Sequence, residues 1–142
     1  MTIAAGSDHA GFEHKEFLKN WLEKKGYTVN DFGTHSAEST DYPDYAHPVA
    51  HAVESGKADF GLLICGSANG MAITANKHAG IRAALCWNEE VASLARQHNN
   101  ANIICIPARF TSPDEARAIL EKFLSAQFEG GRHQRRVEKI NC

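Results

Sequence analysis

The sequence predicts an α/β fold, a three-layer α/β/α sandwich around a doubly wound, five-stranded parallel sheet of the Rossmann-like kind. Short apolar runs alternate along the chain with longer segments of helical spacing, which is typical of parallel strands joined by crossover helices. The run Phe60–Cys65 has no charged residue, as expected of a strand buried on both faces. A length of 142 residues fits a single domain, 1–142.

The first elements are a strand from Thr2 to Ser7, a helix that ends at Gly26, and a second strand over 27–32. The helix is predicted to bury one face, made of Phe17, Leu18, Trp21 and Leu22. Residues 33–44 are polar and are predicted to form a loop with a restricted exit at Tyr42-Pro43. Helical spacing then predicts a second buried face, made of Ala46, Val49, Ala50 and Val53.

After the strand at 60–65, a glycine loop leads into a helical pattern that reaches Lys77, and a fourth strand covers 81–87. Asn88 is predicted to cap a helix with two acids in its first turn, where the helix dipole favours them. Its inner face is expected to hold Val91, Leu94, Ala95 and His98. A fifth strand covers 103–106, and the cap, proline and acid at 112–115 begin another helix. That helix is expected to bury Ile119, Leu120, Phe123 and Leu124.

The composition excludes several classes of protein. Charged residues make up 23% of the chain and the net charge is −2, which does not suit a general nucleic-acid or membrane-surface binder. No apolar run is long enough to span a bilayer, and the first residues do not resemble a signal peptide. The four cysteines are scattered singly, without redox or metal-knuckle spacing. We therefore expect a reduced cytoplasmic enzyme. No cluster of His, Asp and Glu has metal-ligand spacing, so we expect neither a metal-dependent reaction nor a bound metal or cofactor.

The segment Cys65–Gly70 is the strongest functional feature. Its small residues allow a sharp turn and let a ligand approach the backbone closely. Free amides at the start of the next helix favour an anion, so the Cys65 thiol is expected to ionise more readily than an ordinary cysteine. This would give a base or nucleophile beside oxyanion donors. The alternative is a buried cysteine that merely ends a strand.

Other candidate residues lie where parallel-sheet proteins bind ligands, at the carboxyl ends of strands. Asp8 and His9 follow the first strand and Arg109 follows the fifth. Arg132 and Arg136 are four residues apart, so in a helix they form either a solvated basic surface or a phosphate clamp. His98, on the apolar stripe of its helix, is either a core or interface histidine or a catalytic group.

Several motifs run in order along nearly the whole chain: Gly6–Phe12, Thr40–Pro43, Cys65–Gly70, Ala75–Lys77, Ala95–Asn99 and Glu129–Val137. Together they resemble the ribose-5-phosphate isomerase B family, which includes the allose-6-phosphate and galactose-6-phosphate isomerases. The resemblance implies metal-free aldose–ketose isomerisation of a sugar phosphate, with active sites built across a homodimer or a dimer of such dimers. A C-terminal helix over about 129–141 would dock on the partner subunit.

The resemblance also implies roles for individual residues. Cys65 matches the base that moves a proton between C1 and C2, and His98 matches the residue that helps to open the sugar ring. Asp8 is placed for ring opening or hydroxyl proton transfer, and Ser67 supplies a hydroxyl in the loop. The phosphate contacts are His9, Arg109, Arg132 and Arg136. The sugar and the enediolate are held by Tyr42, Asn99 and the loop residues Gly66, Ser67, Ala68, Asn69 and Gly70.

The loop departs from the family's usual Cys-Gly-Thr-Gly-x-Gly at two positions. Ser67 keeps a hydroxyl, but Ala68 replaces a glycine and is expected to avoid a positive φ, which would change the loop geometry. A related branch has a glutamate base where this chain has Met71, which cannot act as a base.

Two alternatives stay open. The same chemistry could act on a six-carbon sugar phosphate such as allose 6-phosphate, or on an unphosphorylated rare sugar. A protein of a different class, a regulatory module that binds a sugar phosphate, would use the loop only as a phosphate cradle. The loop lacks the glycine spacing of dinucleotide-binding and P-loop motifs, and binding alone would not require Cys65, His98 and Asp8 together.

Overall fold

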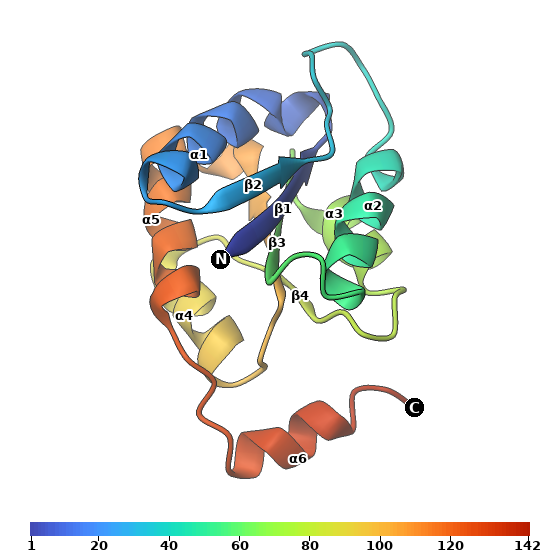
Figure 1. The fold of residues 1–142 in the computed structure, drawn as a ribbon, viewed down its shortest axis with the longest axis vertical. Helices are drawn as coiled ribbons and strands as arrows, with labels where there is room; N and C mark the ends of the chain where they lie inside the picture. Colours follow the sequence, from blue (N-terminus) through green and yellow to red (C-terminus); the bar gives the residue numbers. More distant parts are fainter.

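The computed structural model describes residues 1–142 and confirms the predicted architecture (Figure 1). All strands are parallel and form one five-stranded sheet in the order β2-β1-β3-β5-β4. The strands are β1 (Thr2–Ser7), β2 (Thr28–Asp31), β3 (Phe60–Cys65), β4 (Ala83–Leu85) and β5 (Ile103–Pro107). The three central strands end side by side, because Ser7 pairs with Ile64 and Cys65 pairs with Pro107.

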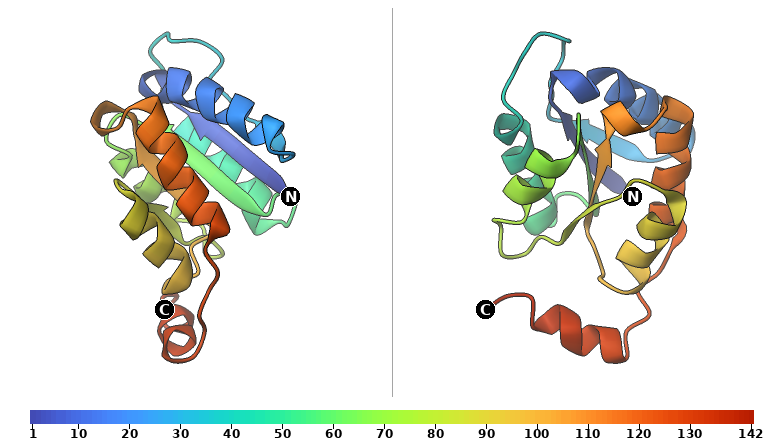
Figure 2. Two further views of the ribbon diagram at one scale, coloured as in Figure 1. Left: turned by 90° about the vertical axis from the view of Figure 1, so that its left-hand side faces the viewer. Right: turned by 180° about the vertical axis from the view of Figure 1, so that it is seen from behind.

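Helices cover both faces of this sheet (Figure 2). One face carries α1 (Phe12–Lys24), α4 (Glu89–Gln97) and α5 (Pro113–Ser125), and the other carries α2 (Pro43–Glu54) and α3 (Asn69–Ala75). Two short 3-10 turns, η1 (His9–Gly11) and η2 (Ala108–Phe110), follow β1 and β5. The last helix, α6 (Arg132–Glu138), lies apart from the sandwich near the end of α4 (Figures 1 and 2).

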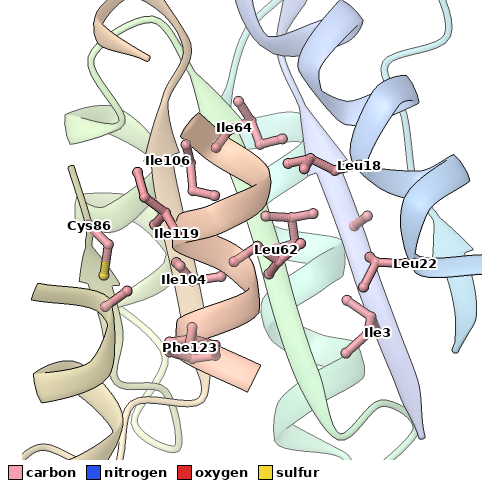
Figure 3. Packing of buried hydrophobic residues seen from close by; sticks show 14 of the residues in the cluster. Ile3, Leu18, Leu22, Leu62, Ile64, Cys86, Ile104, Ile106, Ile119 and Phe123 are labelled. Carbon is pink, nitrogen blue, oxygen red and sulfur yellow. The ribbon is translucent and has the colours of Figure 1, made fainter. Parts of the chain in front are cut away.

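Strand β3 divides its side chains between two apolar clusters, one on each face of the sheet. Leu62 and Ile64 join the cluster beneath α1, α4 and α5, where Phe123 and Leu18 pack (Figure 3). Leu63 and Cys65 face the other way, into the cluster beneath α2 and α3. This alternation follows from the two-residue period of a strand. It directs the Cys65 thiol toward the α2–α3 side of the sheet.

The helix starts behave as predicted. The Asn88 side chain accepts a hydrogen bond from the Val91 amide at 2.8 Å. Ser112 and Glu115 form a reciprocal capping box, with both hydrogen bonds at 3.1 Å. These contacts satisfy backbone donors that the first turn of a helix leaves free.

The predicted inner face of α1 is wrong at Phe17, which is 40% exposed. Lys15 is completely buried instead, and its ammonium donates to both carboxylate oxygens of Asp31 at 2.7 and 2.8 Å. Hydrophobicity alone could not show this, because the burial of a lysine depends on a carboxylate at the end of another strand.

The predicted inner face of α4 is also partly wrong. The buried residues are Ala92 and Ala95, whereas Leu94 and His98 are half-exposed. Small side chains bring this helix close to its neighbours, and His98 is left at its C-terminal end, facing solvent and the C-terminal segment. Two other boundaries differ: β4 is shorter than the predicted 81–87, and α3 already begins at Asn69, inside the expected glycine loop.

Candidate active site

A cavity of about 470 Å³ opens where β1, β3 and β5 end. It is the place where a doubly wound sheet brings together loops that are distant in sequence. The lining residues are Asp8, His9, Ala10, Tyr42, Cys65, Gly66, Ser67, Gly70, Arg109 and Phe110. Besides Cys65, seven of these residues were predicted to belong to the site. The structure therefore brings the candidates at the carboxyl edge into one cavity.

The turn after β1 holds Asp8 and His9 in fixed orientations. One carboxylate oxygen of Asp8 accepts hydrogen bonds from the amides of Ala10 and Gly11 at 3.0 and 3.1 Å, which leaves the other oxygen free of these caps. The His9 ring accepts a hydrogen bond at Nδ1 from the Thr40 amide at 3.2 Å. Because Nδ1 is the acceptor, the neutral ring carries its proton on Nε2, and this nitrogen is a donor for an anionic ligand.

Cys65 lies at the end of β3 with 5% of its surface exposed. Burial raises the pKa of the Cys65 thiol above its ordinary value, and the Asp8 carboxylate raises it further. Backbone amides, chiefly that of Met71, lower the pKa and offset this rise only in part. The prediction of a thiol that ionises readily is therefore wrong for this chain, because desolvation outweighs the amides of the loop.

The loop after Cys65 is held by two close contacts. The Arg109 amide donates to the Gly66 carbonyl at 3.0 Å, and the Arg109 side chain lies along Gly66, where a Cβ would meet Nε at 3.1 Å. The Tyr42 ring packs on Gly70 so closely that any side chain there would collide with it. Glycine at these positions thus allows Arg109 and Tyr42 to reach the cavity.

The sequence led us to expect that Ala68 avoids a positive φ, and this expectation is wrong. Its backbone is left-handed, with φ 67° and ψ −4°, at the position that precedes α3. The residue is completely buried, so the surrounding loop holds the conformation that a glycine would adopt. The loop therefore keeps the glycine-like geometry despite the substitution. Ala68 and Asn69 shape the loop but do not line the cavity.

The other predicted site residues lie elsewhere. His98, Asn99 and Arg136 line a second cavity of about 340 Å³, together with His133, Val137 and Ile140. Arg132 is exposed and lines neither cavity. His98 stacks on His133 with ring centroids 4.2 Å apart, and Glu129 lies within 3.7 Å of both rings.

The two cavities lie at opposite edges of the sheet. Cys65 is at the carboxyl end of β3, whereas Asn99 precedes β5, near the edge where Gly61 pairs with Ile103. Four residues of strand separate Gly61 from Cys65, which corresponds to roughly 13 Å. Within one chain, the structure therefore does not bring His98, Asn99 or the α6 arginines to Cys65.

Several residues in or beside these cavities were not singled out from the sequence. Phe110 is 73% exposed at the mouth of the first cavity, and Thr40 orients His9. Glu129 and His133 surround His98. The motifs Thr40–Pro43 and Glu129–Val137 contained three of the four, but their side-chain contacts could not be read from the sequence.

Two clusters of side chains could hold a metal ion. One consists of His51, Glu54 and His78, and the other of His98, Glu129 and His133. Neither cluster has a spacing in the sequence that is typical of metal ligands. The available signal was the separation of His51 and Glu54 by three residues, which places an imidazole and a carboxylate on one face of a helix.

A family model described as Ribose/Galactose Isomerase matches residues 3–140. The chain belongs to this family. It is 49% identical over 140 residues to ribose-5-phosphate isomerase B of Escherichia coli, covering 99% of this chain and 94% of that protein.

Two solved structures of ribose 5-phosphate isomerase B are also similar. That from Thermotoga maritima is 54% identical, with a TM-score of 0.97, and the match covers 99% of this chain and 97% of the other. That from Mycoplasma genitalium, which holds bound ribulose 5-phosphate, is 44% identical with a TM-score of 0.95, over 98% and 93% of the two chains. No helix of the present chain has the length and apolar character needed to cross a membrane.

Proposed function

We propose that this protein interconverts ribose 5-phosphate and ribulose 5-phosphate through an enediolate, with Cys65 as the base. The observation that carries the proposal is the shared cavity of Cys65, Asp8, His9 and Arg109 in a chain of the isomerase family. It combines a group that can take a proton, a carboxylate, and two donors for a phosphate. The M. genitalium relative with bound ribulose 5-phosphate supports the choice of substrate.

In the proposed reaction, the Cys65 thiolate removes the proton from C2 of the open-chain aldose. The electron pair of the broken C–H bond forms the C1–C2 double bond of an enediolate, and the aldehyde oxygen gains negative charge. The thiol then returns the proton to C1, which gives the ketose. Asp8 and Ser67 are placed beside Cys65 to move the hydroxyl proton between O1 and O2, and loop amides stabilise the oxyanion.

Ring opening and phosphate binding use the remaining residues. His98 is proposed to help open the furanose ring, and Asn99 to hold the sugar. His9 and Arg109 contact the phosphate from the carboxyl-edge cavity, with Arg132 and Arg136 as further contacts. Tyr42 and the backbone of residues 66–70 hold the substrate against Cys65. Phosphate binding far from the reacting carbons can be used to align C1 and C2 with the base.

The residues of the Cys65 cavity and those near α6 lie at opposite edges of the sheet in one chain. They can serve one reaction only if two chains combine. We therefore propose a homodimer in which α6 and His98 of one subunit complete the Cys65 cavity of the other. The exposed arginines of α6 and its separation from the sandwich support this arrangement (Figure 2). Residues 1–142 then form one domain, with the segment of about 129–141 as the docking element. Cys65 must be a reduced thiol, which favours a reducing compartment such as the cytoplasm, and no cysteine is in a disulfide.

A coupled assay for ribulose 5-phosphate formed from ribose 5-phosphate tests the proposal. Allose 6-phosphate and unphosphorylated ribose serve as comparison substrates, since a larger or phosphate-free sugar tests the alternatives directly. We expect the highest kcat/KM with ribose 5-phosphate. Binding of ribose 5-phosphate without turnover would identify a regulatory module instead of an isomerase.

A further inference from the structure

Three histidines and one glutamate meet on the α2 side of the molecule, outside both cavities described above. His47, His51 and Glu54 occupy one face of α2, because they are spaced by four and three residues. His78 lies in the loop after α3 and packs against them. Neither cavity contains any of these side chains, and the proposed isomerase reaction does not use them.

The ligand atoms of His51, Glu54 and His78 lie within 4.8 Å of one another. The rings of His51 and His78 are nearly perpendicular, at 85°, with centroids 4.7 Å apart. Lone pairs lie in the plane of an imidazole, so perpendicular rings can direct them to one point. His51 and Glu54 are exposed and can rotate toward a common ion.

The hydrogen bonds of His78 leave one nitrogen facing a carboxylate. Its Nε2 lies 2.7 Å from Nδ1 of His47, a hydrogen-bond distance. With Nε2–H as the donor, Nδ1 of the neutral ring carries a lone pair and lies 3.7 Å from Oε1 of Glu54. That separation is too long for a hydrogen bond. It is close to the roughly 3.3 Å that separates two ligands of a tetrahedral zinc ion with bonds of about 2.0–2.1 Å.

The surroundings also support these ligands. The other carboxylate oxygen of Glu54 accepts a hydrogen bond from the Gly80 amide at 2.7 Å. On the other side of its ring, His78 donates a hydrogen bond from Nε2 to Nδ1 of His47, which fixes the orientation of the ring. Metal-binding histidines and carboxylates are commonly fixed by such outer hydrogen bonds.

We propose that His51, Glu54 and His78 bind a divalent transition metal of the zinc class, with His47 as the outer hydrogen-bond partner of His78. Imidazole and carboxylate ligands suit Zn²⁺, and three protein ligands leave a further position for water. The ion joins the C-terminal half of α2 to the loop between α3 and β4. Nine residues of helix separate His51 from Tyr42, about 13 Å, so the ion stabilises the fold without touching the Cys65 cavity.

The second cluster, formed by His98, Glu129 and His133, does not have this geometry. The rings of His98 and His133 are stacked, with only 10° between their planes. Their in-plane lone pairs are therefore nearly parallel and cannot converge on one ion without separating the rings. This difference assigns metal binding to the α2 cluster alone.

Calorimetric titration of the chelator-treated protein with Zn²⁺ tests the proposal. We expect one ion per chain, and at a hundredfold excess over Kd a rise in Tm of about 5–10 °C. His51→Gln and His78→Gln should abolish both effects, and His47→Gln should weaken binding by about 10–100-fold. Titration with Co²⁺ gives a second readout, because a bound ion with imidazole ligands changes its visible absorption.

His35→Gln, at an exposed histidine outside both clusters, is the matched control and should bind Zn²⁺ like the unchanged protein. His133→Gln should also retain binding. The proposal is wrong if the unchanged protein binds no Zn²⁺, or if His51→Gln binds it with unchanged affinity; His51 is exposed, so that variant is expected to fold. Loss of binding in His133→Gln would place the ion in the other cluster. None of these measurements depends on the isomerase activity.

Discussion

The two edges of the sheet carry two very different halves of the proposed site. At the carboxyl edge, backbone hydrogen bonds fix Asp8 and His9, and Cys65 is almost completely buried. At the amino edge, His98 and Arg136 lie on a half-exposed helix end and on a helix apart from the sandwich (Figure 1). Side chains of the first half are held by contacts with the sandwich itself, whereas His98 in the second half contacts Glu129 and His133 of the C-terminal segment.

The reason for this difference is the composition of α6. Its only apolar positions are Val137, which is half-buried, and Ile140 just beyond its end, which is 54% exposed. A helix this short is marginal by itself, and so narrow an apolar edge adds little packing. We propose that a second chain packs against the amino-edge half and holds it in place, which the following experiments test.

The largest expected effect concerns the carboxyl-edge half. Cys65→Ala should fold, and its kcat should fall by about 10²–10⁴-fold, the usual contribution of a general base. Cys142→Ala, at an exposed cysteine near the end of the chain, is the matched control and should retain activity. Circular dichroism and the coupled assay measure both properties. Full activity in Cys65→Ala would exclude it as the base.

The second prediction concerns the combination of the two halves. Cys65→Ala and Arg136→Ala proteins should each be nearly inactive, and mixing them with subunit exchange should restore activity. Each heterodimer would hold one site free of both changes, so random exchange restores about a quarter of all sites. Activity is measured before and after exchange, which native mass spectrometry monitors.

The control for this experiment is a mixture of Cys65→Ala with Asp8→Asn. Both changes lie in the same cavity of one chain, so every site of that heterodimer carries one of them. This mixture should stay inactive. If heterodimers form from Cys65→Ala and Arg136→Ala without any gain in activity, the two residues serve a site within one chain.

The third prediction follows from the raised pKa of Cys65. Because the thiol stays protonated at neutral pH, the thiolate fraction and hence kcat/KM should rise about tenfold per pH unit up to the pKa. The ordinary value is 9.0, and burial places the pKa of Cys65 above it. Alkylation by iodoacetamide in a Cys142→Ser background should follow the same profile, with protection by substrate. A plateau in both rates below pH 8 would mean that the assembled site lowers this pKa.

The smallest expected effect concerns the loop that connects β3 to α3. Ala68→Val places a β-branched residue at φ 67° in a completely buried position, which should cost about 2 kcal/mol of folding free energy. Ala68→Gly relieves the left-handed strain but loses a buried methyl group, so its Tm should change little. Thermal unfolding compares the two variants. Equal stability of the valine and alanine proteins would show that the loop relaxes to another conformation.

Local sequence patterns predicted much of this molecule. Alternating elements gave the sandwich, and Asn88 and Ser112 gave helix starts that the structure confirms. The same patterns placed Asp8, Cys65 and Arg109 at one edge, because parallel strands share the direction of their carboxyl ends. Local patterns work in these cases because caps, periodicity and strand direction depend on neighbours in the chain.

Other properties depend on distant contacts and only the tertiary structure decided them. Lys15 is buried because Asp31 ends a different strand, and Ala68 is left-handed because its loop is closed on all sides. The pKa of Cys65 rises because burial, a quantity no local motif contains, outweighs nearby amides. The contact of His78 with His47 and Glu54 also depends on the tertiary structure. His78 lies in a loop 24 to 31 residues further along the chain, and this loop packs on α2. The sequence by itself determined which groups the chain carries, and packing decided which of them meet and in which direction the pKa of Cys65 shifts.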